Sequence, residues 1–224
     1  MLTIHKHTQN QLKNIKNIYQ EMYKRHKKSK YSSNSDSCDS VDYTELVVVS
    51  GNHIYFYSDV CSNTILQLNR AINDLNQPGS GYPEIWLHIN SSGGNVYDAL
   101  AAVDTISDSP TPIITIVEGM AASAASMIAM VGDKRYIRTN GTILIHQLST
   151  TFQGKKSDMD DEFQNLKAMD DKMIDLYVAN TILRRADIKK IINNELEFGA
   201  CKCIEIGIID EIYTGSVPIG KRKR

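Results

Sequence analysis

The sequence has no apolar run approaching the roughly 20 residues that a helix needs to cross a bilayer. Its first residues also lack the apolar core of a secretory signal, which argues against export. The 25 Lys and Arg residues nearly balance the 26 Asp and Glu residues, and the net charge of -1 gives no overall attraction to nucleic acid or to a membrane surface. These absences lead us to expect a cytoplasmic protein.

The chain has few cysteines and no motif for a bound cofactor. Its four cysteines, at positions 38, 61, 201 and 203, suit a reducing compartment. Cys201-Lys202-Cys203 has the form of half a metal site, but no second Cys or His pair stands at zinc-ligand spacing, so we expect ordinary thiols. The sequence has no phosphate-binding loop, so any use of ATP must come from a partner. We expect no metal and no organic cofactor.

The 224 residues, 42% of them hydrophobic and 23% charged, suffice for one substantial domain with tails. Residues 1–30 hold eight Lys or Arg and one acid, and the last four residues are all basic. We therefore divide the chain into a basic arm and polar linker (1–41), a domain (42–213) and a basic tail (214–224). The arm carries a loose helical stripe of apolar residues. The sequence is compatible with either a solvated extension or a helix that docks on a partner.

Strands and helices alternate through the domain. The expected strands lie at 45–49, 54–57, 84–89, 112–117, 136–138, 142–145 and 208–212, and the expected helices at 61–76, 96–106, 123–131 and 159–183, with two short helical pieces before the last strand. Such alternation predicts an α/β domain with largely parallel strand pairing. No internal repeat is visible.

Two turns rich in small residues each join a strand to a helix. In the first, Ile89-Asn90-Ser91-Ser92-Gly93-Gly94, the Gly-Gly step permits positive φ, and the following helix offers free N–H groups. Such a turn can hold a developing oxyanion, although a tight structural turn explains it equally well. In the second, Ser123 stands at the first turn of a helix, a position that suits either a nucleophile or a helix cap.

A histidine adds the third component of acyl-transfer chemistry. His146 ends the apolar strand at 142–145 and is followed by polar residues, which places it near solvent at a strand edge. A lone histidine there is more often structural than catalytic. Together with a candidate serine and a candidate oxyanion turn, however, it supplies the base that such chemistry needs.

The motifs INSSGG, GMAAS, ILIHQ and GIIDEI occur in the order and approximate spacing of the ClpP family of serine peptidases, which residues 45–213 resemble. The resemblance implies a ClpP/crotonase-like fold, in which a repeated β-β-α spiral core carries a protruding handle helix. It places the nucleophile on Ser123 and the general base on His146. Ser126 is a rival nucleophile, but the length of the run 119–132 fits the family only when Ser123 is used.

The resemblance places the oxyanion donors on the backbone N–H groups of Gly93 and Ala124. The family commonly has methionine where Ala124 stands, and a backbone donor tolerates that change. The family's third catalytic residue is an aspartate, and counting back from the GIID motif puts its position on Glu195, with Glu197 as the alternative. Glutamate can also orient a histidine. If both glutamates are surface charges, the site is a Ser–His dyad.

The family's architecture gives the expected function: a serine endopeptidase subunit of a self-compartmentalising barrel. The resemblance implies stacked heptameric rings joined by the handle helix (159–183), which degrade unfolded polypeptides and short peptides delivered by an AAA+ unfoldase. The alternatives are an inactive ring subunit that acts as a scaffold and an acyl-CoA enzyme of the crotonase fold. A Ser–Lys peptidase is a weaker alternative, because no lysine is suitably placed and no membrane segment is present.

Overall fold

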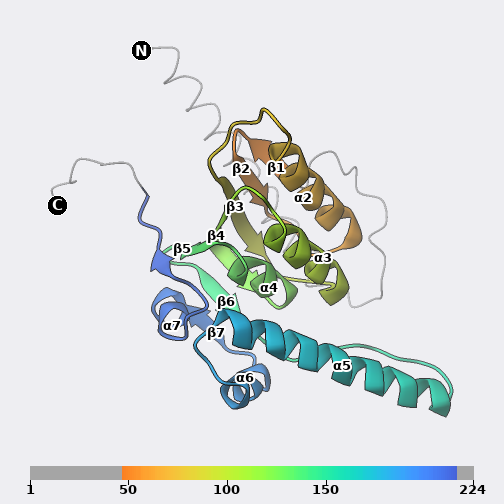
Figure 1. Ribbon diagram of the computed structural model, residues 1–224. Helices are drawn as coiled ribbons and strands as arrows, with labels where there is room; N and C mark the ends of the chain where they lie inside the picture. Colours follow the sequence, from red (N-terminus) through yellow and green to blue (C-terminus); the bar gives the residue numbers. More distant parts are fainter. Residues whose placement is uncertain (1–46, 216–224) are drawn as a thin grey trace, which may run out of the picture. The chain divides into compact units, whose positions relative to one another are not determined.

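One eight-stranded sheet organises the computed structural model, which describes residues 47–215 (Figure 1). Its strands are β1 (Val47–Ser50), β2 (His53–Phe56), β3 (Ile85–Ser91), β4 (Ile113–Ala122), β5 (Lys134–Ile137), β6 (Thr142–Leu144), β7 (Glu197–Gly199) and β8 (Glu211–Ile212). The expected arm at 1–41 and nearly all of the tail at 214–224 lie outside the described residues.

Parallel pairing dominates the sheet, which confirms the expected α/β class. The order is β1-β2-β3-β4-β5-β8, and every neighbouring pair in it is parallel except the β1–β2 hairpin. Strand β4 extends beyond its expected end at residue 117, because its last residues pair with the separate strand β6. Strand β6 also pairs with β7 in antiparallel register.

Two short strands differ from the expectation. Strand β7 was not expected at all, since its three residues carry no clear alternation of apolar and polar side chains. The last strand, expected at 208–212, is limited to Glu211–Ile212. The backbone N–H groups of Ile208 and Ile209 instead donate to the carbonyl of Cys203, which closes the preceding helix and keeps these residues out of the ladder.

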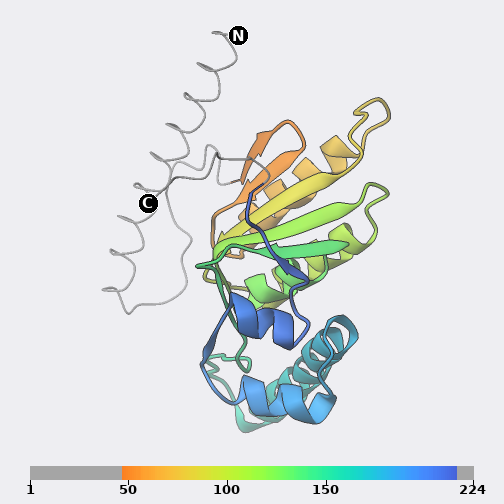
Figure 2. The ribbon, with the colours of Figure 1, turned by 90° about the vertical axis from the view of Figure 1, so that its left-hand side faces the viewer.

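The helices are α2 (Ser62–Leu75), α3 (Val96–Ser107), α4 (Ala124–Met130), α5 (Lys156–Asn180), α6 (Arg185–Ile192) and α7 (Ala200–Glu205). Figure 2 shows α2 and α3 on one face of the sheet. The fully buried side chains of Ile85, Leu87 and Ile89 alternate along β3 toward the core. The side chain of Asn95 caps α3 by accepting from the N–H groups of Tyr97 and Asp98.

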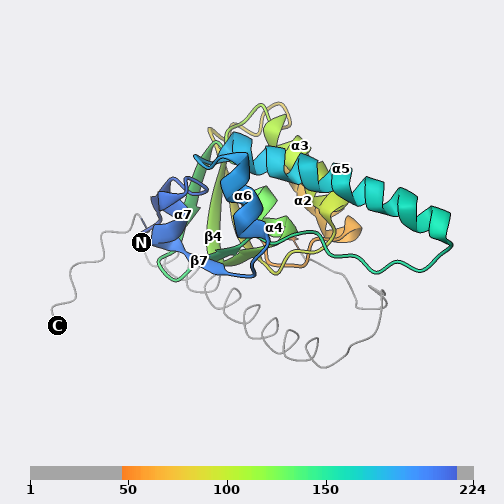
Figure 3. The same cartoon turned by 90° about the horizontal axis from the view of Figure 1, so that it is seen from below.

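Helix α5 is the protruding helix that the family resemblance led us to expect (Figures 1 and 3). It begins at Lys156, three residues before the expected start, because the Asp158 side chain accepts the N–H of Lys155 and caps the first turn. It ends at Asn180, before Thr181 adopts an extended backbone. Only Met173, Ile174 and Tyr177 are buried, so the N-terminal part of the helix projects from the domain.

The two cysteines near the C-terminus lie in different environments. Cys203 is buried and its thiol donates to the Phe198 carbonyl at 3.2 Å, while burial raises its pKa to about 12. Cys201 is exposed. No group of three or more potential metal ligands occurs within residues 47–215. Over the same residues, no helix is both long and apolar enough to cross a membrane.

Several polar side chains form a hydrogen-bonded cluster on the sheet face opposite the core. Glu118 of β4 accepts from the Tyr57 hydroxyl and from Arg138, and its Oε1 lies 3.1 Å from Nδ1 of His88. The other ring nitrogen of His88 lies 2.9 Å from Nδ1 of His53. Burial, together with the nearby His53 and Arg138, lowers the pKa of His88 from 6.5 to about 3.

This lowered pKa predicts that the fold loses stability on acidification. Between about pH 6.5 and pH 3 the unfolded chain binds a proton at His88 that the folded chain does not, so stability falls as pH falls through that window. From about pH 7.5 to pH 5, the loss in the free energy of unfolding attributable to His88 is up to about 2 kcal/mol. We expect urea unfolding of His88→Phe to show a smaller loss than wild type.

The matched control for this prediction is Thr115→Val, which removes a buried hydroxyl without removing a titrating group. Its free energy of unfolding should fall on acidification as steeply as that of wild type. An equally steep fall in His88→Phe would show that the acid sensitivity arises elsewhere.

Candidate active site

Ser123 has an uncommon backbone conformation at the junction of β4 and α4. With φ 53° and ψ -126°, it is the only non-glycine residue with positive φ among residues 47–215. Such a conformation costs about 1–3 kcal/mol and persists only where the surroundings hold it. The Ser123 N–H donates a hydrogen bond to the Leu144 carbonyl at 2.9 Å, which helps to hold this conformation. The result is a sharp strand-to-helix turn with the serine at its tip.

The glycine turn after β3 lies directly against this serine. A side chain on Gly93 would place its Cβ 2.7 Å from the Cβ of Ser123 and 3.1 Å from the nitrogen of Ala124. At Gly94 a Cβ would lie 2.2 Å from the carbonyl oxygen of Val60. Both glycines have positive φ, 95° and 146°. Only glycine combines this positive φ with this lack of space for a side chain. The short distances from Gly93 to Ser123 and Ala124 show that the two turns recognised in the sequence lie against each other.

Backbone hydrogen bonds fix the glycine turn in place. The N–H of Val60 donates to the carbonyl of Gly93 at 2.8 Å, and the N–H of Asn95 donates to the carbonyl of Val60 at 2.8 Å. The N–H of Gly93 donates to Ser91 Oγ at 3.2 Å. Ala124 is the first residue of α4, where an N–H has no acceptor within the helix. The two expected oxyanion donors therefore flank Ser123.

Asn90 joins the two turns, a role that its residue type and position in the sequence do not indicate. Its Oδ1 accepts the N–H of Met120 at 3.0 Å, and a Cβ on Gly119 would lie 2.5 Å from the same oxygen. The β3–β4 register is irregular between Ile89 and Ser91, so this side chain replaces a backbone partner. The only signal in the sequence was an asparagine within the first of the two turns.

His146 lies in the same cavity as Ser123. It follows β6 by two residues, and the bond from Ser123 N–H to Leu144 holds that strand against the serine turn. On the other side, the N–H of Gln147 donates to the carbonyl of Ile192 at 2.8 Å. His146 is half-buried. Within residues 47–215, no hydrogen bond joins its ring to the Ser123 hydroxyl.

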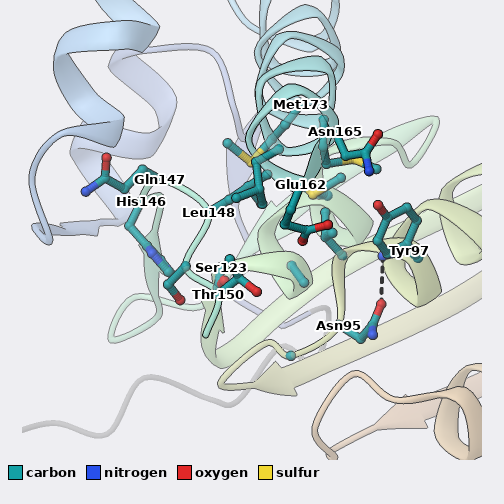
Figure 4. Close-up of a pocket in the computed structure, with 17 residues that line it drawn as sticks. Asn95, Tyr97, Ser123, His146, Gln147, Leu148, Thr150, Glu162, Asn165 and Met173 are labelled. Atoms are coloured by element: carbon teal, nitrogen blue, oxygen red, sulfur yellow. Dashed lines mark hydrogen bonds between the residues drawn. The ribbon is translucent and has the colours of Figure 1, made fainter. Parts of the chain in front are cut away.

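The cavity has a volume of about 230 Å³, and Ser123, Ala124 and His146 are among its lining residues. Figure 4 shows Glu162, Asn165 and Met173 of α5 across from Ser123. The contribution of α5 to the site could not be predicted from the sequence. The apolar stripe of this helix could equally have packed on the domain's core, and periodicity does not distinguish a core from a cavity wall.

The candidates for the third catalytic residue lie outside the cavity lining. Glu195 is exposed and makes no hydrogen bond or ion pair within residues 47–215. Strands β6 and β7 pair Leu144 with Glu197, and this pairing ends two residues before His146. The side chain of Glu197 is exposed in β7.

The rival nucleophile Ser126 is also outside the cavity lining. Its side chain is 0% exposed, and its hydroxyl contacts Ser123 O and Tyr177 Oη. A substrate in the cavity therefore meets Ser123, whereas the Ser126 hydroxyl lies within the protein.

Comparison with known proteins matches the sequence of this chain to a family. The family model described as Clp protease matches residues 34–216. A curated relative, the ATP-dependent Clp protease proteolytic subunit of Deinococcus radiodurans, is 32% identical over 131 residues. The match covers 58% of this chain and 64% of that relative's length, a little less than two thirds. The extent of the family match shows that the chain belongs to the Clp protease family.

Proposed function

We propose that the chain is a serine endopeptidase that uses Ser123 as nucleophile and His146 as general base. The observation that carries this proposal is the strained Ser123 at the tip of a strand-to-helix turn, in a cavity that His146 also lines. Among the described residues, strain of this kind falls on a single non-glycine residue, the one that the family resemblance assigns to nucleophilic attack.

The proposed reaction proceeds through an acyl-enzyme. His146 accepts the hydroxyl proton of Ser123 while the oxygen attacks a peptide carbonyl, and the N–H groups of Gly93 and Ala124 hold the oxyanion. The protonated His146 then donates its proton to the leaving amine, and the C–N bond breaks. Water, deprotonated by His146, attacks the acyl-enzyme; the ester C–O bond to Ser123 then breaks, His146 returns the proton to the Ser123 oxygen, and the acid product leaves. One oxyanion donor is worth roughly 2.7–4 kcal/mol in other serine peptidases.

Two adjustments on substrate binding are part of this mechanism. The Ser123 hydroxyl and the His146 ring must form a hydrogen bond, a contact that commonly tightens only in the substrate complex. The Gly93 N–H must exchange Ser91 Oγ, at 3.2 Å, for the oxyanion. Both changes are local, because the backbone contacts with Leu144 and Val60 fix the turns themselves.

We assign the third catalytic role, orientation of the His146 ring, to Glu195. The antiparallel pairing of β6 and β7 supports this choice, because Glu197 itself pairs with Leu144 and the chain just before it runs beside the chain that leads to His146. We expect Glu195→Ala to lower kcat roughly 10²- to 10⁴-fold, as the loss of the orienting carboxylate does in related triads.

Glu197→Ala is the matched control, since it removes an exposed glutamate two residues away and should leave kcat within about 2-fold of wild type. Steady-state hydrolysis of a fluorogenic peptide measures both variants. Full activity in Glu195→Ala would reduce the triad to a dyad.

We further propose that copies of the chain assemble into stacked heptameric rings, into which an AAA+ unfoldase feeds unfolded polypeptides. Helix α5 supports the assembly, because its projecting part exposes Met159 (47%) and Phe163 (70%), large apolar side chains that another copy could cover. The relative's printed name, a proteolytic subunit of an ATP-dependent protease, supports the partnership.

The experiment that tests this function combines peptide hydrolysis with native mass spectrometry on wild type and Ser123→Ala. We expect both proteins to form the same large ring assembly, and only the wild type to hydrolyse the peptide. Assembled wild-type rings without hydrolysis would favour the scaffold role instead. Equal hydrolysis by the two proteins would contradict the proposed nucleophile.

A further inference from the structure

A buried chain of hydroxyl groups runs from α5 to the backbone of Ser123. The hydroxyl of Tyr177 lies 2.6 Å from Ser126 Oγ, and Ser126 Oγ donates to the carbonyl oxygen of Ser123 at 2.5 Å. The exposed fractions of the two side chains are 1% for Tyr177 and 0% for Ser126. Neither side chain lines the cavity. The proposed mechanism uses neither hydroxyl.

The direction of these hydrogen bonds follows from the number of protons. A serine hydroxyl has one hydrogen, and Ser126 donates it to the Ser123 carbonyl. The hydrogen between the two hydroxyls therefore comes from Tyr177. Burial raises the pKa of Tyr177 to about 12, so its phenol stays protonated at neutral pH and remains a donor. The chain runs from Tyr177 to Ser126 to the Ser123 carbonyl.

The acceptor at the end of this chain belongs to the same peptide group as an oxyanion donor. In a trans peptide the C=O and the N–H point in opposite directions, and the N–H that opposes the Ser123 carbonyl is that of Ala124. The carbonyl also accepts the N–H of Ser126 at 3.0 Å. Two hydrogen bonds on the α4 side thus fix the peptide plane and direct the Ala124 N–H away from the helix.

We propose that Ser126 and Tyr177 are positioning residues that hold the Ser123–Ala124 peptide in the orientation required for oxyanion stabilisation. This inference rests on the proposed function. The strained φ/ψ combination of Ser123 needs such support, because rotation of this peptide would change ψ toward the left-handed region at the same φ and turn the Ala124 N–H away. Successive hydroxyl hydrogen bonds also polarise one another, which strengthens the amide as a donor.

The inference predicts a specific kinetic signature. The oxyanion forms only in the transition state, so a misoriented donor lowers kcat and leaves KM nearly unchanged. We expect kcat to fall roughly 10- to 100-fold in Ser126→Ala and roughly 3- to 10-fold in Tyr177→Phe, because the second variant keeps the bond to the Ser123 carbonyl. The double variant should match Ser126→Ala, since the effect of Tyr177 passes through Ser126.

Thr115→Val is the matched control. The Thr115 hydroxyl is 0% exposed and donates to the carbonyl of Ala129 at 2.6 Å, near the other end of α4. Its removal costs a buried hydrogen bond to the same helix without contact with the Ser123 peptide. This variant should lose thermal stability as the test variants do, and its kcat should stay within about 2-fold of wild type.

The experiment measures kcat, KM and the inhibition constant of a peptidyl boronate, which forms a tetrahedral adduct on the serine. If the inference holds, boronate affinity falls in Ser126→Ala and Tyr177→Phe by about the same factor as kcat, and in Thr115→Val neither changes.

Unchanged kcat and boronate affinity in both test variants, with an active wild type, would overturn this inference alone. If Ser126→Ala does not fold, Tyr177→Phe decides by the same criteria. A wild type that neither hydrolyses peptide nor binds boronate would contradict the proposed function itself, and the inference with it.

Discussion

Substitution of Ser123 by alanine is expected to lower peptide hydrolysis by roughly 10⁴- to 10⁶-fold, because it removes the atom that attacks the substrate. The fold should tolerate the change, since alanine also fits a turn held by backbone contacts, such as the bond from its N–H to Leu144. Fluorogenic peptide hydrolysis measures the loss, and native mass spectrometry establishes that assembly is retained. Activity within about 10-fold of wild type would exclude Ser123 as the nucleophile.

Ser126→Ala provides the comparison for this result, because both substitutions remove a hydroxyl from the same turn. Ser126 is buried and its hydroxyl is bonded to Ser123 O and Tyr177. The Ser126 variant should retain measurable hydrolysis and covalent labelling by a fluorophosphonate. Loss of labelling in this variant, with labelling retained in Ser123→Ala, would reverse the assignment of the two serines.

The second large effect is expected for Gly93→Ala. The new Cβ would lie 2.5 Å from the Ala122 carbonyl oxygen and 2.7 Å from the Cβ of Ser123, at a φ of 95° that alanine rarely adopts. Relief of these contacts must move the glycine turn away from Ser123. We expect kcat to fall roughly 10²- to 10³-fold through loss of an oxyanion donor. The free energy of unfolding should fall by about 1–3 kcal/mol from the backbone strain.

Gly199→Ala is the control for this prediction. A Cβ at Gly199 meets nothing within 4 Å, and its φ of -71° suits any residue. We expect this variant to keep its activity and a free energy of unfolding within about 1 kcal/mol of wild type, because the gain from restricting the unfolded chain is offset by the poor fit of alanine to the N-cap of α7. Wild-type kcat in Gly93→Ala would show that this turn plays no part in catalysis.

The larger elements of the fold could be predicted from the sequence because apolar periodicity is a local property. Alternation along Ile85, Leu87 and Ile89 is visible in the sequence and appears as one buried face of β3. Strand β7 and the extension of β4 were missed, because their pairing with β6 depends on contacts distant in the sequence. Local patterns contain little of that information.

The candidate site likewise has parts that the sequence predicts and parts that it does not. Residue type and order make three parts of the site recognisable in the sequence. Ser123 and the glycine turn each stand between a strand and a helix, and His146 follows the end of a strand. The hydroxyl chain through Tyr177 and the cavity wall on α5 are not recognisable there, because they depend on how α5 docks against α4. In the sequence, Ser126 is a rival nucleophile; the structure shows it bonded to the backbone of the other serine.

Active-site labelling with a fluorophosphonate, followed by peptide mapping, identifies the residue that attacks the substrate. We expect one phosphonylated residue in the wild type, mapped to Ser123, and none in Ser123→Ala. Labelling should be slow in His146→Ala, because the hydroxyl then lacks its base. A phosphonate group mapped to any other residue, or labelling of Ser123→Ala at the wild-type level, would exclude Ser123 as the nucleophile.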